Sequence, residues 1–310
     1  MNLIDSVAEW VLGALPYDRS DPDVVRALNR KHPGELLALY YNWRNKLIPA
    51  HPRQVMCSRE FDQNPIAAER SDVIAKIIAH IEQGDDLTKY LSRRVRTGFE
   101  LPQNPAKKML NKLQHLDLLL NEWRIHHLHL STTVEPDGFV ERDDPLLFAI
   151  FLPGKAYLLD IGTHDTFADD GLARIAIESW PADQLFLELD GVLGLRDGSP
   201  YSSEDRKKLR GAGIGSFIQI GNRVFSPPGG ISTAGTSTQA SMWSNHIMRA
   251  LRHFEEQVQK DPSQIVDIIR QHGAHPSDTP EFKFAMFENG FGVIETQSGA
   301  GINLSASAPQ

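Results

Sequence analysis

The sequence predicts an α+β protein with a helical N-terminal region, a central antiparallel meander packed on helices, and a C-terminal α+β domain with hairpins. Two observations lead to this expectation. Apolar residues recur at three- and four-residue spacing through most of the first 120 residues, and the pattern changes to strand-like alternation at Trp123. A chain of 310 residues is long enough for two or three domains. We therefore expect a helical region at 1–84, an α+β core at 85–195 and a C-terminal α+β domain at 196–310.

Helical periodicity dominates the N-terminal part of the chain. Asp, Asn or Pro opens several of the periodic segments and glycine closes two of them, as is typical of helix ends. The predicted helices cover residues 21–31, 33–47, 65–84, 86–98 and 104–123.

Three consecutive strands are predicted next, because "RIHHLHLS" alternates, "PLLFAIFLPG" is a continuous apolar run and "KAYLLDIG" alternates again. A helix ending at Pro181 follows. In the last third we expect a short helix at 202–213, a Gly-Asn hairpin at 216–230, a long helix at 236–260 and an Asn-Gly hairpin at 281–296.

Residues 230–237 fit a phosphate-loop spacing, but threonine stands where the lysine is needed, which favours an ordinary helix start.

Composition narrows the range of functions. The net charge of −8 argues against bulk electrostatic coating of nucleic acid, and a single cysteine, Cys57, excludes an internal disulfide framework. No apolar run approaches the length of a membrane span, and the first residues carry acids where a signal peptide carries bases. We therefore expect a cytoplasmic protein with no membrane partner. The charge of one stretch is opposite to that of the whole chain, since residues 89–129 carry eight Lys/Arg against three Asp/Glu. This basic stretch favours an anionic ligand.

The stretch "WRIHHLHLS", residues 123–131, is the strongest functional signal. Strand alternation puts one set of side chains on one face, Trp123, Ile125, His127, His129 and Ser131, and the other set on the opposite face, Arg124, His126, Leu128 and Leu130. The two in-register histidines, His127 and His129, are then roughly 7 Å apart. We expect His127 and His129 to share a partly solvated concave face with Arg124 or Arg142 and with His164, within reach of one phosphate-sized ligand.

Three chemistries could use this pair. The first is metal-free phosphodiester cleavage, in which histidines take a proton from a ribose 2′-hydroxyl and return one to the leaving oxygen while arginine stabilises the phosphorane. The second is a metal site completed by His164, Asp165 or Asp160. The third is a 2H-phosphoesterase-like arrangement, because residues 129–131 and 164–166 both read His-x-Ser/Thr.

The order of elements over residues 85–182 resembles the RelE/ParE type of bacterial toxin. The resemblance rests on helices leading into "EWRIHHLHLS", a loop carrying "ERDD", the segments "LLFAIF" and "KAYLLDIGTHDTF", and a closing helix. It implies a helical hairpin packed on a sheet and either metal-free RNA cleavage or poisoning of gyrase. The functional positions that it implies are Arg124, His127, His129, Arg142 and His164. The chain departs from this family in its length and in its negative charge.

We therefore expect a toxin-like, metal-independent endoribonuclease that needs no cofactor and acts in antiphage defence or in a toxin–antitoxin setting. Its expected partners are RNA and an antitoxin or defence-system protein. The alternatives are a metal-dependent hydrolase using the H-x-H pair and a non-catalytic interaction protein whose histidine strand is structural.

Overall fold

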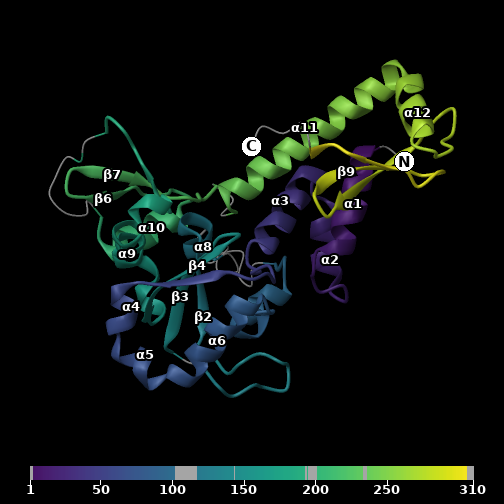
Figure 1. Ribbon diagram of the computed structural model, residues 1–310. Coiled ribbons are helices and arrows are strands. Elements are labelled where there is room, and N and C mark those ends of the chain that lie inside the picture. The colour runs from purple at the N-terminus through teal and green to yellow at the C-terminus, as the bar shows by residue number, and fades with distance from the viewer. Residues whose placement is uncertain are drawn as a thin grey trace. The chain divides into compact units, whose positions relative to one another are not determined.

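The computed structural model describes residues 3–101, 117–142, 144–192, 194, 201–232 and 236–305. The described chain forms two compact units, each an α+β arrangement as the sequence predicts. Residues 42–238 form a central unit, and the two ends of the chain together form a terminal unit. Figure 1 shows the labelled elements of both units.

The central unit carries a mixed four-stranded sheet. Its helices and strands are β1 (Gln54–Cys57), α4 (Arg59–Gln63), α5 (Pro65–Glu69), α6 (Ser71–Gln83), α8 (Leu118–Trp123), β2 (Ile125–His129), β3 (Leu146–Phe151), β4 (Lys155–Gly162), α9 (Gly171–Ser179), β5 (Leu187–Glu188), α10 (Ser203–Gly211), β6 (Ile218–Ile220) and β7 (Arg223–Ser226). Short 3₁₀ helices are η1 (Thr88–Tyr90), η2 (Arg93–Arg96), η3 (His164–Ala168) and η4 (Pro181–Asp183). A second, three-stranded sheet has the order β5-β7-β6.

The predicted meander is confirmed, since β2, β3 and β4 pair antiparallel in sequence order. The sheet has the order β1-β4-β3-β2, so the histidine-bearing strand lies at one edge. His129 pairs with Leu146, and Leu146 pairs in turn with Gly162 at the end of β4. This register brings the residues that follow Gly162 to the end of the sheet where His129 lies.

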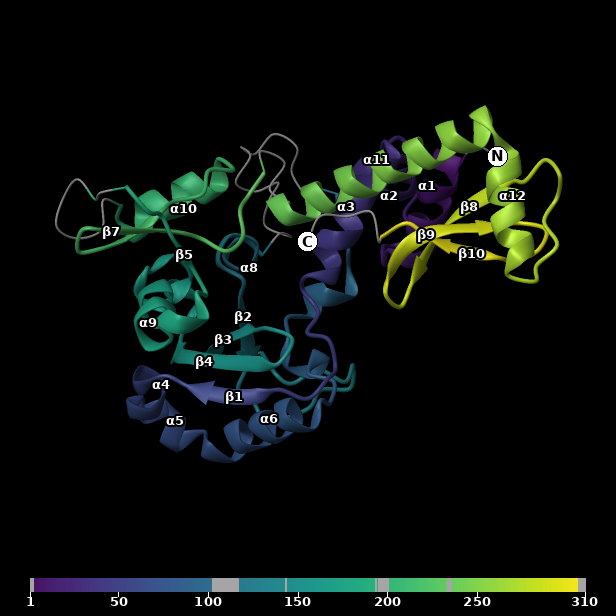
Figure 2. The ribbon, with the colours of Figure 1, turned by 45° about the horizontal axis from the view of Figure 1, so that its top comes forward.

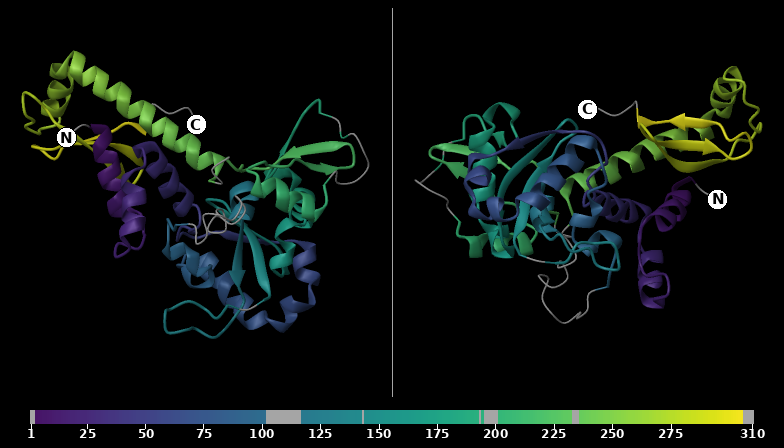
Figure 3. Two further views of the ribbon diagram at one scale, coloured as in Figure 1. Left: turned by 180° about the vertical axis from the view of Figure 1, so that it is seen from behind. Right: turned by 60° about the horizontal axis from the view of Figure 1, so that its bottom comes forward.

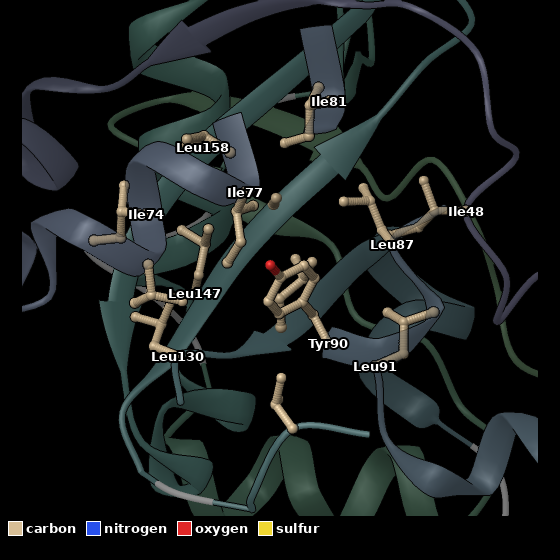
Figure 4. Close-up of a cluster of buried hydrophobic side chains, with 14 of the residues drawn as sticks. Ile48, Ile74, Ile77, Ile81, Leu87, Tyr90, Leu91, Leu130, Leu147 and Leu158 are labelled. Carbon is tan, nitrogen blue, oxygen red and sulfur yellow. The ribbon is translucent and has the colours of Figure 1, made fainter. Parts of the chain in front are cut away.

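Apolar cores cover both faces of the four-stranded sheet, with α6 on one side and α9 on the other (Figure 2). On the α6 side, Tyr90 lies among aliphatic side chains from α6 and from the strands, including Ile77 and Leu147 (Figure 4). On the α9 side, Trp123, Phe148 and Tyr157 are fully buried. Leu128 belongs to the first core and Ile125 to the second, which confirms the alternation expected of β2.

The terminal unit joins residues far apart in the sequence. Its elements are α1 (Leu3–Ala14), α2 (Pro22–Asn29), α3 (Pro33–Arg44), α11 (Thr238–Lys260), α12 (Pro262–Gln271) and a sheet of β8 (Phe282–Phe287), β9 (Gly290–Glu295) and β10 (Gly301–Asn303). Figure 3 shows these three strands from two further directions. The Ser6 hydroxyl accepts a 2.8 Å hydrogen bond from the Phe284 backbone, and the Trp10 ring meets the Phe284 ring edge-on at 5.3 Å. Among the described helices, none is long and apolar enough to cross a membrane.

The structure differs from the expected arrangement in three places. The predicted boundaries at 84/85 and 195/196 do not coincide with the two units, because the C-terminal hairpin packs on α1 and the chain ends therefore combine. Strand β1 was not predicted; it pairs parallel to β4 within a part of the chain expected to be helical. Residues 86–98 form the two turns η1 and η2 instead of one helix. Most of the helix predicted at 104–123 lies outside the described residues, which show it only as α8.

Candidate active site

Strand β2 places His127 and His129 side by side on the α9 face of the sheet. Their ring centroids are 6.2 Å apart, close to the strand repeat of two residues. His126 points to the opposite face, where its ring meets Phe151 edge-on at 5.5 Å. The alternation of β2 thus separates His126 from the other two histidines.

A tight turn after β4 supplies the third histidine. The Thr163 and Thr166 side chains cap η3 reciprocally, and a Cβ on Gly162 would lie only 2.5 Å from the Thr166 hydroxyl, so the turn requires a glycine there. Side chains three residues apart eclipse in a 3₁₀ helix. His164 and Phe167 therefore project together, with ring centroids 5.3 Å apart.

The three imidazoles form a nearly equilateral triangle. His164 lies 6.3 Å from His127 and 6.4 Å from His129, measured between ring centroids. The Phe167 ring packs 4.9 Å from His127, within the same group. We call these four side chains, His127, His129, His164 and Phe167, the histidine cluster.

Burial distinguishes the members of the cluster. His129 is 1% exposed. The side chain of His127 is 11% exposed and that of His164 is 54% exposed. The face is therefore less solvated than expected, because Phe148 and Phe167 cover part of it. His164 forms its exposed side.

Two carboxylates lie beside the histidines, and one of them forms a hydrogen bond. Asp144 Oδ1 lies 2.8 Å from His164 Nδ1, a hydrogen bond that leaves Nε2 as the other ring nitrogen for a ligand. Asp117 caps the N-terminus of α8 through Oδ1, and its Oδ2 lies 3.5 Å from His127 Nδ1. The first aspartate fixes an exposed ring and the second lies beside a largely buried one.

The surroundings of His127 favour its neutral form. Burial lowers the pKa of His127, the Asp117 carboxylate partly opposes this shift, and the charges of His164, Arg142 and Arg94 add to it. A histidine that is neutral at neutral pH can accept a proton. His127 is thus suited to act as a base.

Two arginines lie near the cluster, and only one of them was predicted. Arg142 Nη2 donates a 3.3 Å hydrogen bond to the Ser92 hydroxyl, and the same hydroxyl accepts from the backbone N–H of Arg94 at 3.4 Å. Ser92 therefore ties the loop that carries Arg142 to the start of η2. Both charges act on His127.

Arg124 does not join this group, contrary to the expectation. It ends α8 in the left-handed conformation, with φ 59°, and burial lowers the pKa of its guanidinium. Its charge acts on His126, on the other face of the strand. Strand alternation by itself puts Arg124 on the face of His126, opposite His127 and His129, and the structure agrees with that alternation.

The residues proposed for a metal site do not converge. A tetrahedral zinc bound by three imidazole nitrogens at about 2.1 Å would bring the ring centroids to about 5 Å from one another, closer than they lie here. Asp160 Oδ1 accepts a 2.7 Å hydrogen bond from the side chain of Asn64, which lies between α4 and α5. Within the described ranges, no group of three His, Cys, Asp or Glu side chains is placed to hold a metal ion.

The hydroxyls of the two His-x-Ser/Thr segments are engaged by the backbone. Ser131 accepts a hydrogen bond from the Thr133 N–H at 3.2 Å, and Thr166 accepts one from the Thr163 N–H at 3.2 Å. Both hydroxyls thus stabilise local turns, which argues against the paired arrangement of a 2H-phosphoesterase.

The glycines of the phosphate-loop-like stretch are used structurally. Gly229 and Gly230 donate hydrogen bonds to the carbonyls of Glu122 and Asn121, and a Cβ on Gly229 would lie 2.2 Å from the Asn121 oxygen. Ser237 N–H donates to the Asn42 side chain at 2.8 Å. The close backbone contact accounts for the glycine pair.

Sequence reasoning missed Asp144, Asp117 and Phe167 as partners of the cluster. A weak signal existed, since Asp144 stands in the "ERDD" loop beside Arg142 and Phe167 follows His164 by one 3₁₀ turn. The described chain thus defines an α+β protein with a histidine cluster at one edge of a mixed sheet. No protein-family model, curated protein or solved structure matches the chain.

Proposed function

We propose that the protein is a metal-independent endoribonuclease that cleaves RNA by acid–base catalysis in the histidine cluster. The observation that carries the proposal is the placement of His164, exposed and oriented by Asp144, 6.3 Å from a largely buried His127 of lowered pKa. Two imidazoles in unlike environments are suited to opposite roles in proton transfer.

In this proposal His127 accepts the proton of the ribose 2′-hydroxyl. The 2′-oxygen then attacks phosphorus, and the exposed His164 donates a proton to the departing 5′-oxygen. The products are a 2′,3′-cyclic phosphate and a free 5′-hydroxyl, so no water, metal or cofactor is consumed in this step. His129 is too buried to meet substrate and supports the other two rings.

In this proposal Arg142 and Arg94 stabilise the phosphorane; in support, the charges of both act on His127. This assignment replaces Arg124 of the expected set with Arg94. The biological setting that we propose is a toxin-like activity in the cytoplasm, related to antiphage defence and controlled by a partner protein. The resemblance of residues 85–182 to the RelE/ParE type supports that setting.

The test is cleavage of a 5′-labelled, unstructured RNA and of total RNA by the purified full chain in EDTA. We expect His127→Ala and His164→Ala each to lower the cleavage rate by about 100-fold or more, the usual contribution of one general acid or base. His253→Ala is the control, since this exposed histidine lies in α11 of the terminal unit. A single 2′-deoxy substitution should abolish cleavage at that position.

The pH profile adds an independent check. Because burial lowers the pKa of His127, the midpoint of the acidic limb of the pH profile should lie below the ordinary histidine pKa of about 6.5. Activity that disappears in EDTA and returns with zinc or manganese would instead support the metal-dependent alternative. RNA binding without cleavage would support the non-catalytic one.

A further inference from the structure

A buried ion pair connects the two chain segments that carry the cluster. Arg210 of α10 donates through Nε to the carboxylate of Glu122 and through Nη1 to the backbone carbonyl of Phe167. Glu122 is fully buried and Arg210 is 4% exposed. Glu122 lies in α8, two residues before β2 begins, whereas Phe167 lies in η3 beside His164.

The remaining contacts of this pair restrict its geometry. The other Glu122 oxygen accepts a 2.7 Å hydrogen bond from the Ser216 N–H. The Arg210 guanidinium stacks 4.2 Å from the centre of the Trp123 ring. Arg210 is thus held between a helix end, a 3₁₀ turn and an indole, and it cannot shift without moving one of them.

The pair is poorly explained by stability alone. Burying two charges carries a desolvation cost, and the attraction between the charges often does no more than offset that cost. Well-packed apolar residues can therefore replace such a pair without loss of stability. In addition, Nη2 of Arg210 has no hydrogen-bond partner within the described residues. What the pair adds is a defined register between α8 and η3, which an apolar contact would not specify.

We propose that Arg210 is a positioning residue of the active site, which holds the Phe167 carbonyl and Glu122 so that His164 stays opposite His127. The catalytic part of this inference rests on the proposed function. The structural part does not, because it concerns the distance between two histidines.

The experiment compares Glu122→Met/Arg210→Met with the wild-type chain. The double substitution leaves no unpaired buried charge and is expected to keep the fold, whereas Arg210→Met alone leaves Glu122 unpaired and should lower the melting temperature. Arg206→Met is the matched control. Arg206 is also buried in α10, and its guanidinium donates a 3.1 Å hydrogen bond to Asp170.

Two readouts are taken on each folded variant. By NMR, the wild type and Arg206→Met should show cross-peaks between the rings of Phe167, His127 and His164, and the double variant should lose those to His127. In RNA cleavage, the kcat of the double variant should be at least tenfold lower than that of the wild type, with little change in KM. The single variant Arg210→Lys should show a similar loss, because a lysine ammonium cannot reproduce the planar guanidinium that donates to both Glu122 and the Phe167 carbonyl.

A folded double variant with wild-type ring contacts and wild-type kcat would overturn the inference. If the wild-type chain cleaves no RNA, the proposed function fails, and the NMR comparison still decides whether Arg210 sets the distance between the histidines. Loss of the ring contacts in Arg206→Met as well would also contradict a specific role for Arg210.

Discussion

His164 and Phe167 stack on one face of a single 3₁₀ turn, with their ring planes inclined by 31° and their centroids 5.3 Å apart. The aromatic ring therefore supports an exposed imidazole on one side, while Asp144 binds its Nδ1. The same ring also packs on His127, which makes Phe167 the shared neighbour of the two histidines in the proposed reaction.

Phe167→Leu should release His164 with little effect on the fold. In the wild type, the Phe167 ring current should shift the His164 ring protons upfield relative to those of an exposed histidine. The variant should return them to ordinary positions and lose about 1 kcal/mol of stability, as expected for a partly buried ring. Phe217→Leu, at a 55% exposed position of the same unit, is the control and should leave these resonances unchanged.

Acid should destabilise the protein through His126. Burial lowers the pKa of His126 from 6.5 to about 4. Between these values the unfolded chain binds a proton that the folded chain does not, so stability decreases as pH falls from 6.5 toward 4. The full shift corresponds to up to about 3 kcal/mol of the free energy of unfolding. At pH 5, about 2 kcal/mol of this contribution should already be lost.

Urea denaturation of the wild type and of His126→Leu at pH 7.5 and pH 5 measures this contribution. Between pH 7.5 and pH 5, the free energy of unfolding should fall by about 2 kcal/mol more in the wild type than in His126→Leu. Equal pH dependence of the two proteins would show that His126 is accessible to protons in the folded state.

Gly229→Ala should be strongly destabilising. The added Cβ would lie 2.2 Å from the Asn121 carbonyl oxygen, which belongs to backbone and cannot rotate away. We expect a loss of about 2–4 kcal/mol, in the range of severe local strain. Gly154→Ala in the same unit is the matched control, since no atom lies within 4 Å of its Cβ position, and a comparable loss there would contradict the steric explanation.

The Cys57 thiol should react slowly with iodoacetamide. Cys57 is exposed, but partial desolvation raises its pKa and the nearby Asp62 carboxylate raises it further, so the reactive thiolate is scarce at pH 7.5. Alkylation followed by mass spectrometry should be several-fold slower in the folded protein than in urea. Asp62→Asn should accelerate it; an unchanged rate in this variant would remove Asp62 as a cause.

The local elements of this fold could be predicted, whereas their long-range combination could not. Alternation correctly placed His127 and His129 on one face, because that pattern depends only on the residues of β2. The strand at Gln54–Cys57 was missed because it is short and lies between helices, and its pairing with β4 depends on residues about a hundred positions away.

The site shows the same limit. His164 was expected near His127 because a meander returns the chain, and the register of His129, Leu146 and Gly162 provides that return. The Glu122–Arg210 pair spans 88 residues, and no periodicity links its members. Arg124 was grouped with His127 although strand alternation puts it on the opposite face with His126, and in the structure its charge acts on His126.

The combination of both chain ends in the terminal unit has a consequence for synthesis on the ribosome. Helices α1 and α2 are made before the strand that packs on α1, because that strand includes Phe284 and follows them by more than 250 residues. Residues 42–238 are complete before that strand exists, and domains generally fold as units during synthesis. The nascent chain therefore lacks the β8 partner of α1 until that strand is made, and the terminal unit is finished only after residues 42–238 have been made.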